Sequence, residues 1–117
     1  MLGTLVRKLN FSLNGLRDTW ISETSFRQWS FVVIVSDGLA LYLFSVSFVT
    51  GVILFAGFVL LAAELSNTAI EAVVDRVDTQ WHALARKAKD AGSAMVFLTF
   101  LGLVTVWVFA LLDARAG

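Results

Sequence analysis

The stretch AGSAMVFLTFLGLVTVWVFALL, residues 91–112, contains no charged side chain. As an α-helix it is long enough to cross a hydrocarbon layer about 30 Å thick. The whole chain has the same character, because 58% of its 117 residues are hydrophobic, only 15% are charged, and the mean hydropathy is +0.81. This composition is too apolar for a soluble globular domain. The sequence therefore predicts an all-α integral membrane protein, with residues 1–117 forming a single membrane domain.

Two further apolar segments precede this stretch. Residues 29–48 form the first, interrupted by Asp37 and Gly38, and residues 49–77 form the second, which starts apolar and becomes polar. Small residues between Ser45 and Gly51 are compatible with a turn, so the two segments are expected to form an antiparallel hairpin. We expect three transmembrane helices, over residues 29–48, 49–77 and 91–112.

The first 28 residues alternate apolar and charged side chains. No apolar core followed by a small-residue cleavage site is present, so this segment is not read as a signal peptide. Apolar residues recur at steps of three and four, which indicates an amphipathic helix lying in the membrane interface. These residues are Leu2, Leu5, Val6, Leu9, Leu13, Leu16 and Trp20.

The cations are distributed unevenly about the predicted spans. Four of the nine Lys and Arg residues precede the first span, four lie between Arg76, at the end of the second span, and the start of the third, and only Arg115 follows the third. The positive-inside rule then places the N-terminus in the cytoplasm and the C-terminus on the opposite side of the membrane. The formal net charge is zero, which gives no sign of a nucleic-acid partner. Three helices are too few to enclose a lumen, so oligomerisation is expected.

Polar residues gather where the second span ends, in AELSNTAIEAVVDRV, residues 63–77. Glu64, Asn67, Glu71 and Asp75 follow one another at helical spacing and should form one stripe. Acidic groups inside a membrane are costly and usually functional. Oxygen ligands at a membrane surface suit Mg²⁺, which commonly shares them with nucleotide phosphates. Two simpler interpretations remain open: Asp75 is merely solvated at a helix end, and Asn67 is polar glue between helices.

A second polar cluster is RKAKDAGSA, residues 86–94. Lys87, Lys89 and Asp90 come before Gly92 and Ser93, which we expect at the N-terminus of the third span, where free N–H groups favour anions. The alternative is that these cations only set topology and contact anionic lipid headgroups. The nucleotide-binding patterns GxxxxGK[ST] and GxGxxG are both absent, which argues against a soluble-kinase nucleotide site.

Both polar clusters, together with part of the N-terminal segment, resemble the sequence motifs of a known protein family. Three stretches are similar in order and spacing to the motifs of the small prokaryotic diacylglycerol kinases. They are GLRDTWISETSFRQ in residues 15–28, AELSNTAIEAVVDRV in residues 63–77, and WHALARKAKDAGSA in residues 81–94. The resemblance covers nearly the whole chain. It implies a homotrimer with three spans and an N-terminal surface helix per protomer, with active sites shared between neighbouring subunits. Such enzymes use MgATP to phosphorylate a lipid hydroxyl.

The resemblance also implies roles for individual residues. Glu23 and Glu71 would bind Mg²⁺, Glu71 would act as general base on the lipid hydroxyl, and Glu64 would orient that hydroxyl. The implied catalytic set is Glu64, Asn67, Glu71 and Lys89, and the implied ATP-binding set is Ser12, Glu23, Asp75, Lys89 and Asp90. Asp37 matches no position of the family.

Two alternatives to phosphorylation of diacylglycerol remain. Relatives in some bacteria act on undecaprenol, although KDAGSA and SETSFRQ look more like the diacylglycerol branch. From another class of protein, a small transporter or channel subunit would use Glu64 and Glu71 as an ion-coupling pair. Glu23 and the basic loop beside the acids argue against a transporter, which requires neither.

Overall fold

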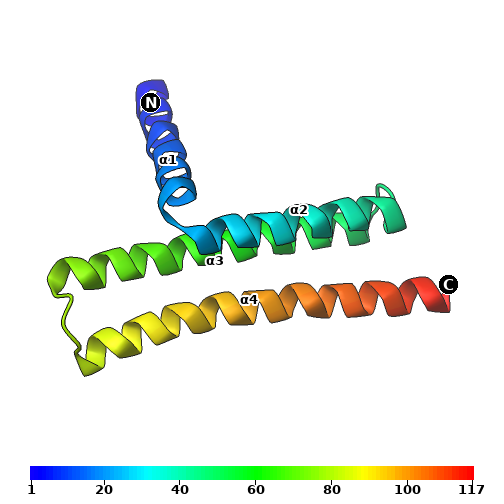
Figure 1. Ribbon diagram of the computed structural model, residues 1–117. Coiled ribbons are helices and arrows are strands. Elements are labelled where there is room, and N and C mark those ends of the chain that lie inside the picture. Colours follow the sequence, from blue (N-terminus) through cyan, green and yellow to red (C-terminus); the bar gives the residue numbers. More distant parts are fainter.

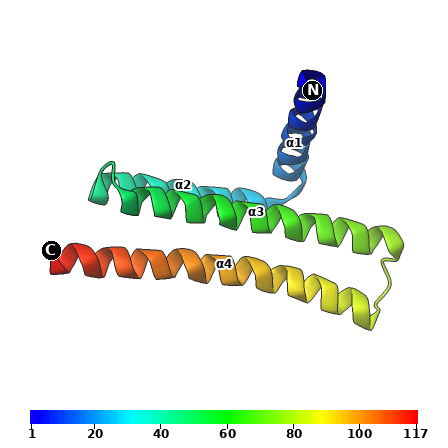
Figure 2. The ribbon, with the colours of Figure 1, turned by 180° about the vertical axis from the view of Figure 1, so that it is seen from behind.

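The computed structural model describes residues 1–117 and consists of four helices with no strand: α1 (Leu2–Ser22), α2 (Thr24–Phe44), α3 (Phe48–Val77) and α4 (Ala83–Ala116). Helices α2, α3 and α4 run side by side, each antiparallel to the next, with α3 between the other two (Figure 1). Helix α1 projects away from this bundle, as the view from behind also shows (Figure 2). The predicted all-α fold is confirmed.

The first helix ends earlier than the predicted segment of residues 1–28. Glu23 is extended, with φ −113° and ψ 107°, and separates α1 from α2. The apolar repeat of α1 stops at Trp20, so no apolar stripe carries the helix through the polar run of residues 22–24. The Arg27 guanidinium then donates to the carbonyl oxygens of Trp20 and Ile21, which are free at the end of α1. Residues 24–28 therefore belong to α2.

The predicted hairpin between the first two apolar segments is confirmed, with a turn over residues 45–47. Ser45 has a φ of 55°, which reverses the chain direction. The Ser47 hydroxyl caps α3 by accepting from the Thr50 amide at 3.3 Å, and the Thr50 hydroxyl donates to the Ser45 carbonyl at 2.6 Å. Local hydrogen bonds thus close the turn, and α3 begins at Phe48, one residue before the predicted segment of residues 49–77.

The core of the bundle lies along α3, whose buried positions recur every three or four residues. Its buried apolar residues contact partners on both flanking helices; the cluster comprises Val33, Ala40, Ile53, Leu60, Ala63, Val96, Leu103 and Ala110. Helices α2 and α4 meet only through long side chains. The Trp107 indole N–H donates to the Ser36 hydroxyl at 2.8 Å, and the rings of Trp29 and Phe100 lie 5.2 Å apart. Between spans, close packing and such polar links take the place of the hydrophobic effect.

Gly57 allows α2 to approach α3 closely. A Cβ atom at this position would lie 2.7 Å from Val33 Cγ1. We predict that Gly57→Ala lowers the free energy of unfolding by about 1–3 kcal/mol, because the added methyl group overpacks the helix contact. Gly51→Ala on the same helix is the control, since nothing lies within 4 Å of the added atom. Thermal unfolding in detergent measures both, and equal melting temperatures for the two variants would contradict the close contact.

Helix α4 begins before the predicted span of residues 91–112. The His82 ring nitrogen Nδ1 accepts from the Leu84 amide at 3.0 Å, which caps the helix, and residues 83–90 contain no glycine or proline to end it. The prediction that Gly92 and Ser93 stand at a helix N-terminus is therefore wrong. Both lie well inside α4, where the backbone N–H groups are bonded within the helix and offer no anion site.

Two helices are long and apolar enough to cross a membrane. Helices α3 and α4 each contain an 18-residue window, with mean hydropathy 2.3 and 2.5 respectively. Helix α2 is not among them, because its first turns carry Arg27 and Gln28 and because Asp37 interrupts its apolar run. Asp37 has one carboxylate oxygen, Oδ1, buried near Gly57 without a hydrogen-bond partner.

Candidate active site

Helix α3 presents the predicted polar stripe over its second half. Glu64, Asn67, Glu71 and Asp75 all lie on this one helix, as their spacing requires. Their exposure rises along the stripe: Glu64 is only 4% exposed, Asn67 and Glu71 are half-buried, and Asp75 is exposed. The stripe therefore runs from the interior of the bundle to its surface.

Glu64 is held from the neighbouring helix. The Ser25 hydroxyl, in the first turn of α2, donates to Glu64 Oε1 at 2.6 Å. This bond brings the start of α2 level with the middle of α3. Glu23, which lies in the break between α1 and α2, is thereby kept near the same end of the bundle.

Asn67 connects Glu71 to helix α4. Its Nδ2 donates to Glu71 Oε1 at 3.4 Å, while its Oδ1 is buried and has no partner. Oδ1 packs directly against Gly92 of α4, where a Cβ atom would collide with it. The amide therefore fits between the two helices only because residue 92 has no side chain.

A cavity of about 430 Å³ opens beside these groups and is bounded by α2, α3 and α4. Its polar wall contains two carboxylates, an amide and two hydroxyls, and its apolar wall is largely aromatic. The lining residues are Ser25, Trp29, Glu64, Asn67, Glu71, Ser93, Val96, Phe97 and Phe100. An amphipathic ligand with a polar head and an apolar body matches this arrangement.

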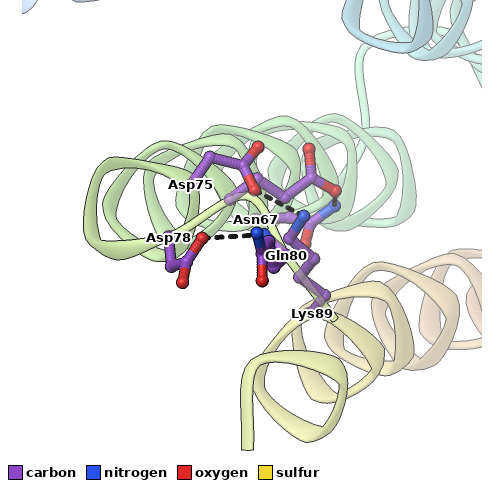
Figure 3. Close-up of polar contacts among 6 residues, drawn as sticks. Asn67, Asp75, Asp78, Gln80 and Lys89 are labelled. Atoms are coloured by element: carbon purple, nitrogen blue, oxygen red, sulfur yellow. Dashed lines mark hydrogen bonds and ion pairs between the residues drawn. The ribbon is translucent and has the colours of Figure 1, made fainter. Parts of the chain in front are cut away.

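Nearer the loop, an ion pair joins α3 to α4. Lys89 Nζ lies 2.6 Å from Asp75 Oδ1, and Figure 3 shows the two side chains meeting across the helices. Asp90 instead pairs with Arg86, one turn earlier on α4, at 2.8 Å. All four side chains are substantially exposed, and exposed ion pairs contribute little to stability. The cations Lys89 and Arg86 are therefore free to exchange their carboxylate partners for an anionic ligand.

Ser12 and Glu23 do not line this cavity. Ser12 belongs to α1, the helix that projects from the bundle (Figure 1). Its side chain is exposed and donates to the Lys8 carbonyl of the same helix at 3.2 Å. Glu23 is half-buried at the junction of α1 and α2. Within one protomer, no three acidic or histidine side chains group closely enough to hold a metal ion.

Several lining residues were not among the predicted site residues. Ser25, Trp29, Phe97 and Phe100 come from segments without a charge pattern, and only the packing of three helices brings them together. Ser25 carried one signal, since it falls within the SETSFRQ stretch that matches the family motif. Gly92 was assigned to a helix terminus, whereas its role is to admit the Asn67 amide.

Known proteins similar in sequence to this chain belong to one family. Residues 10–111 match the family described as prokaryotic diacylglycerol kinase. The chain is 37% identical over 108 residues to a diacylglycerol kinase of Escherichia coli K12, covering 92% of this chain and 88% of the relative. It is 34% identical over 103 residues to one of Haemophilus influenzae, covering 88% and 87%, and 35% identical over 112 residues to one of Pseudomonas aeruginosa, covering 95% and 90%.

The chain therefore belongs to the prokaryotic diacylglycerol kinase family, and the predicted resemblance is confirmed. It is an enzyme of this family and a membrane protein with long apolar helices. Membership of an enzyme family decides against the transporter alternative.

Proposed function

We propose that the protein phosphorylates diacylglycerol to phosphatidic acid with ATP, at the cytoplasmic surface of the bacterial inner membrane. The observation that carries this proposal is the cavity in which Glu64, Asn67 and Glu71 face an aromatic wall. A lipid alcohol needs both features, because its hydroxyl must reach polar catalytic groups while its acyl chains stay in an apolar environment.

The dimensions of the bundle support a third span. Helix α2 has 21 residues, about 31 Å at a rise of about 1.5 Å per residue, which matches the hydrocarbon thickness. The Ser25–Glu64 bond puts Glu64 level with the start of α2. Helix α3 continues from Glu64 to Val77 for about 20 Å more. In this arrangement the stripe begins at the membrane surface and extends into the cytoplasm. Helix α1 would lie along the cytoplasmic interface, with the N-terminus in the cytoplasm and the C-terminus in the periplasm.

This placement supports phosphoryl transfer between a lipid and a water-soluble nucleotide. Such transfer needs chiefly an in-line arrangement, neutralised phosphate oxygens and a base within reach of the hydroxyl. In the proposed mechanism Glu64 orients the lipid hydroxyl in the cavity. Glu71, which is hydrogen-bonded to Asn67, accepts the proton of the lipid hydroxyl. The hydroxyl oxygen attacks the γ-phosphorus of ATP, the bond to the β,γ-bridging oxygen breaks, and ADP leaves. Lys89 leaves Asp75 to contact the phosphates, and Asp75 and Asp90 position the nucleotide.

The chemistry of the donor set fits Mg²⁺. This ion is usually held by one or two carboxylates together with phosphate oxygens and water, so a site with no cluster of three acids is compatible with it. Glu71 has one oxygen bonded to Asn67 and a second not engaged by any side chain. Glu23 and Glu71 are the proposed ligands, and the bound ion would neutralise charge on the transferring phosphate.

We further propose a homotrimer with shared active sites. The proposal is supported by the site residues that a single chain leaves apart. Ser12 belongs to the implied nucleotide site, yet it lies on α1, which projects away from its own bundle (Figure 2). In a trimer the projecting α1 would lie over a neighbouring subunit and bring Ser12 towards that subunit's nucleotide. The apolar flanks of the bundle, on which most large hydrophobic side chains are exposed, would be covered by lipid and by other protomers.

The test is a two-acceptor kinase assay. Purified protein in mixed micelles receives MgATP with either dioleoylglycerol or undecaprenol, and the phosphorylated lipid is quantified. We expect phosphatidic acid as the main product. Phosphorylation of undecaprenol alone would assign the alternative substrate, and transfer to neither lipid would refute the proposed function.

The proposed metal role of Glu23 gives a separate prediction. Glu23→Gln removes a negative charge while keeping the shape of the side chain, so we expect the Mg²⁺ concentration for half-maximal activity to rise at least tenfold. Loss of even a supporting group commonly weakens metal affinity by about ten- to a hundredfold. Asp18→Asn, at an exposed acid of α1, serves as the control. A Mg²⁺ activation curve identical to that of the unmodified protein would exclude Glu23 as a ligand.

A further inference from the structure

The hydroxyl of Ser25 is the sole hydrogen-bond partner of a buried acid. It donates to Glu64 Oε1 at 2.6 Å across 39 positions of sequence, and Glu64 is 4% exposed. No cation neutralises Glu64, because the two ion pairs of the chain are Arg86–Asp90 and Lys89–Asp75. The position of this carboxylate therefore depends on a single donor from another helix.

The geometry of the contact is that of a strong hydrogen bond. Hydroxyl-to-carboxylate bonds are typically about 2.5–2.7 Å long, and they are stronger than bonds between neutral groups. Ser25 also stands in the first turn of α2, whose N-terminus has no side-chain cap. The free amides and the dipole at a helix start favour a nearby negative charge. Both features favour the Glu64 side chain at this place, where a buried polar group without a partner would be costly.

The bond also reduces the freedom of the Glu64 side chain. A glutamate has several rotatable bonds, and a donor that fixes Oε1 leaves Oε2 as the oxygen able to interact with a ligand. Ser25 and Glu64 both line the cavity described above. By fixing Oε1, Ser25 thus also determines where Glu64 Oε2 would contact the lipid hydroxyl.

We propose that Ser25 is a positioning residue, which holds the Glu64 carboxylate in the orientation that receives the acceptor hydroxyl. This inference rests on the proposed function. A purely structural role, in which the bond only fastens α2 to α3, is the competing explanation. The two differ in what the loss of the hydroxyl changes: turnover of the lipid in the first case, stability of the bundle in the second.

The experiment compares three variants in the assay with dioleoylglycerol. In Ser25→Ala we expect kcat to fall about ten- to a hundredfold, the range expected for a lost hydrogen bond to a charged group, while KM for ATP stays within about twofold of the unmodified value. Ser25→Thr restores a hydroxyl and should recover most of kcat. Ser30→Ala is the matched control, because Ser30 is a buried serine of the same helix whose hydroxyl donates only to the Phe26 carbonyl. It should retain full activity.

The outcomes separate this inference from the proposed function. An active unmodified protein with an unchanged kcat in Ser25→Ala would overturn the positioning role alone. Equal losses in Ser25→Ala and Ser25→Thr, or in Ser25→Ala and Ser30→Ala, would likewise overturn it, because the hydroxyl at residue 25 would not be the cause. An inactive unmodified protein would refute the proposed function and the positioning role together.

Discussion

Replacing Glu71 by glutamine should lower kcat for phosphatidic acid formation by about 10³-fold, the middle of the range for loss of a general base. Glutamine keeps the length of the side chain and an oxygen that can accept from Asn67 Nδ2, so the local fold should survive. It lacks the charge needed to take the hydroxyl proton and to hold Mg²⁺. The initial rate with MgATP and dioleoylglycerol measures the loss.

The control for this variant is Asp113→Asn. Asp113 is an exposed acid near the C-terminal end of α4, close to the start of α3 and far along the bundle from the polar stripe. We expect it to keep full activity, and both variants to show the same oligomeric state on cross-linking. A Glu71→Gln protein with more than a tenth of the normal kcat would show that Glu71 is not the base.

The second large effect is expected at Gly92, a residue with no functional group. In Gly92→Ala the new methyl group would collide with Asn67 Oδ1, so either the amide must turn away or α4 must move from α3. Turning the amide breaks its bond to Glu71, and a shift of α4 widens the cavity that Asn67 and Glu71 share with Ser93. A displacement of about 1 Å at a catalytic group can cost about a hundredfold in rate, and we expect kcat to fall by roughly that factor.

Gly102→Ala provides the matched comparison, because Gly102 lies further along α4 with nothing within 4 Å of an added Cβ. Alanine favours a helix over glycine, so this variant should be at least as stable as the unmodified protein and fully active. Kinase rates and melting temperatures of the two variants test whether a side chain at residue 92 disturbs the site. If both alanine variants were equally active, the Asn67 amide would not need the space at residue 92.

The sequence was most informative where one helix decides the answer. Hydrophobic length alone predicted a membrane helix over residues 91–112, and helical spacing alone placed Glu64, Asn67, Glu71 and Asp75 on one stripe. Both patterns depend only on the fixed geometry of an α-helix. Asp75 and Lys89 were each singled out, but their pairing depends on how α3 packs against α4.

Contacts between side chains of different helices could not be predicted from helical spacing or hydrophobic length. Ser25 is an ordinary serine in the sequence, and its bond to Glu64 exists only because α2 packs against α3 in one register. Gly92 was misplaced for a related reason. A polar stretch before an apolar one suggested a helix start, whereas residues 83–90 are good helix formers and continue the same helix.

Helix ends were predicted to within a few residues where an apolar repeat stops, as at Val77. They were predicted less well where hydrogen bonds of polar side chains determine the end of the helix. The break at Glu23 depends on Arg27 binding the last carbonyls of α1, an interaction across the turn that no periodicity encodes. The surroundings of Asp37 also could not be predicted from the sequence. Its sequence position marked it as unusual, and the structure gives its Oδ1 a buried place near Gly57 without a partner.

The central claim is that the acidic stripe of α3 holds a metal-bound nucleotide next to the lipid cavity. Paramagnetic broadening by Mn²⁺, added with a non-hydrolysable ATP analogue, tests this directly on ¹⁵N-labelled protein. The account predicts strong, nucleotide-dependent broadening of the Asn67 side-chain amide and of the Trp29 indole, both of which line the cavity. The Trp107 indole, bonded to Ser36 deeper in the bundle, should stay sharp. Broadening of Trp107 with Asn67 and Trp29 unaffected would contradict the account.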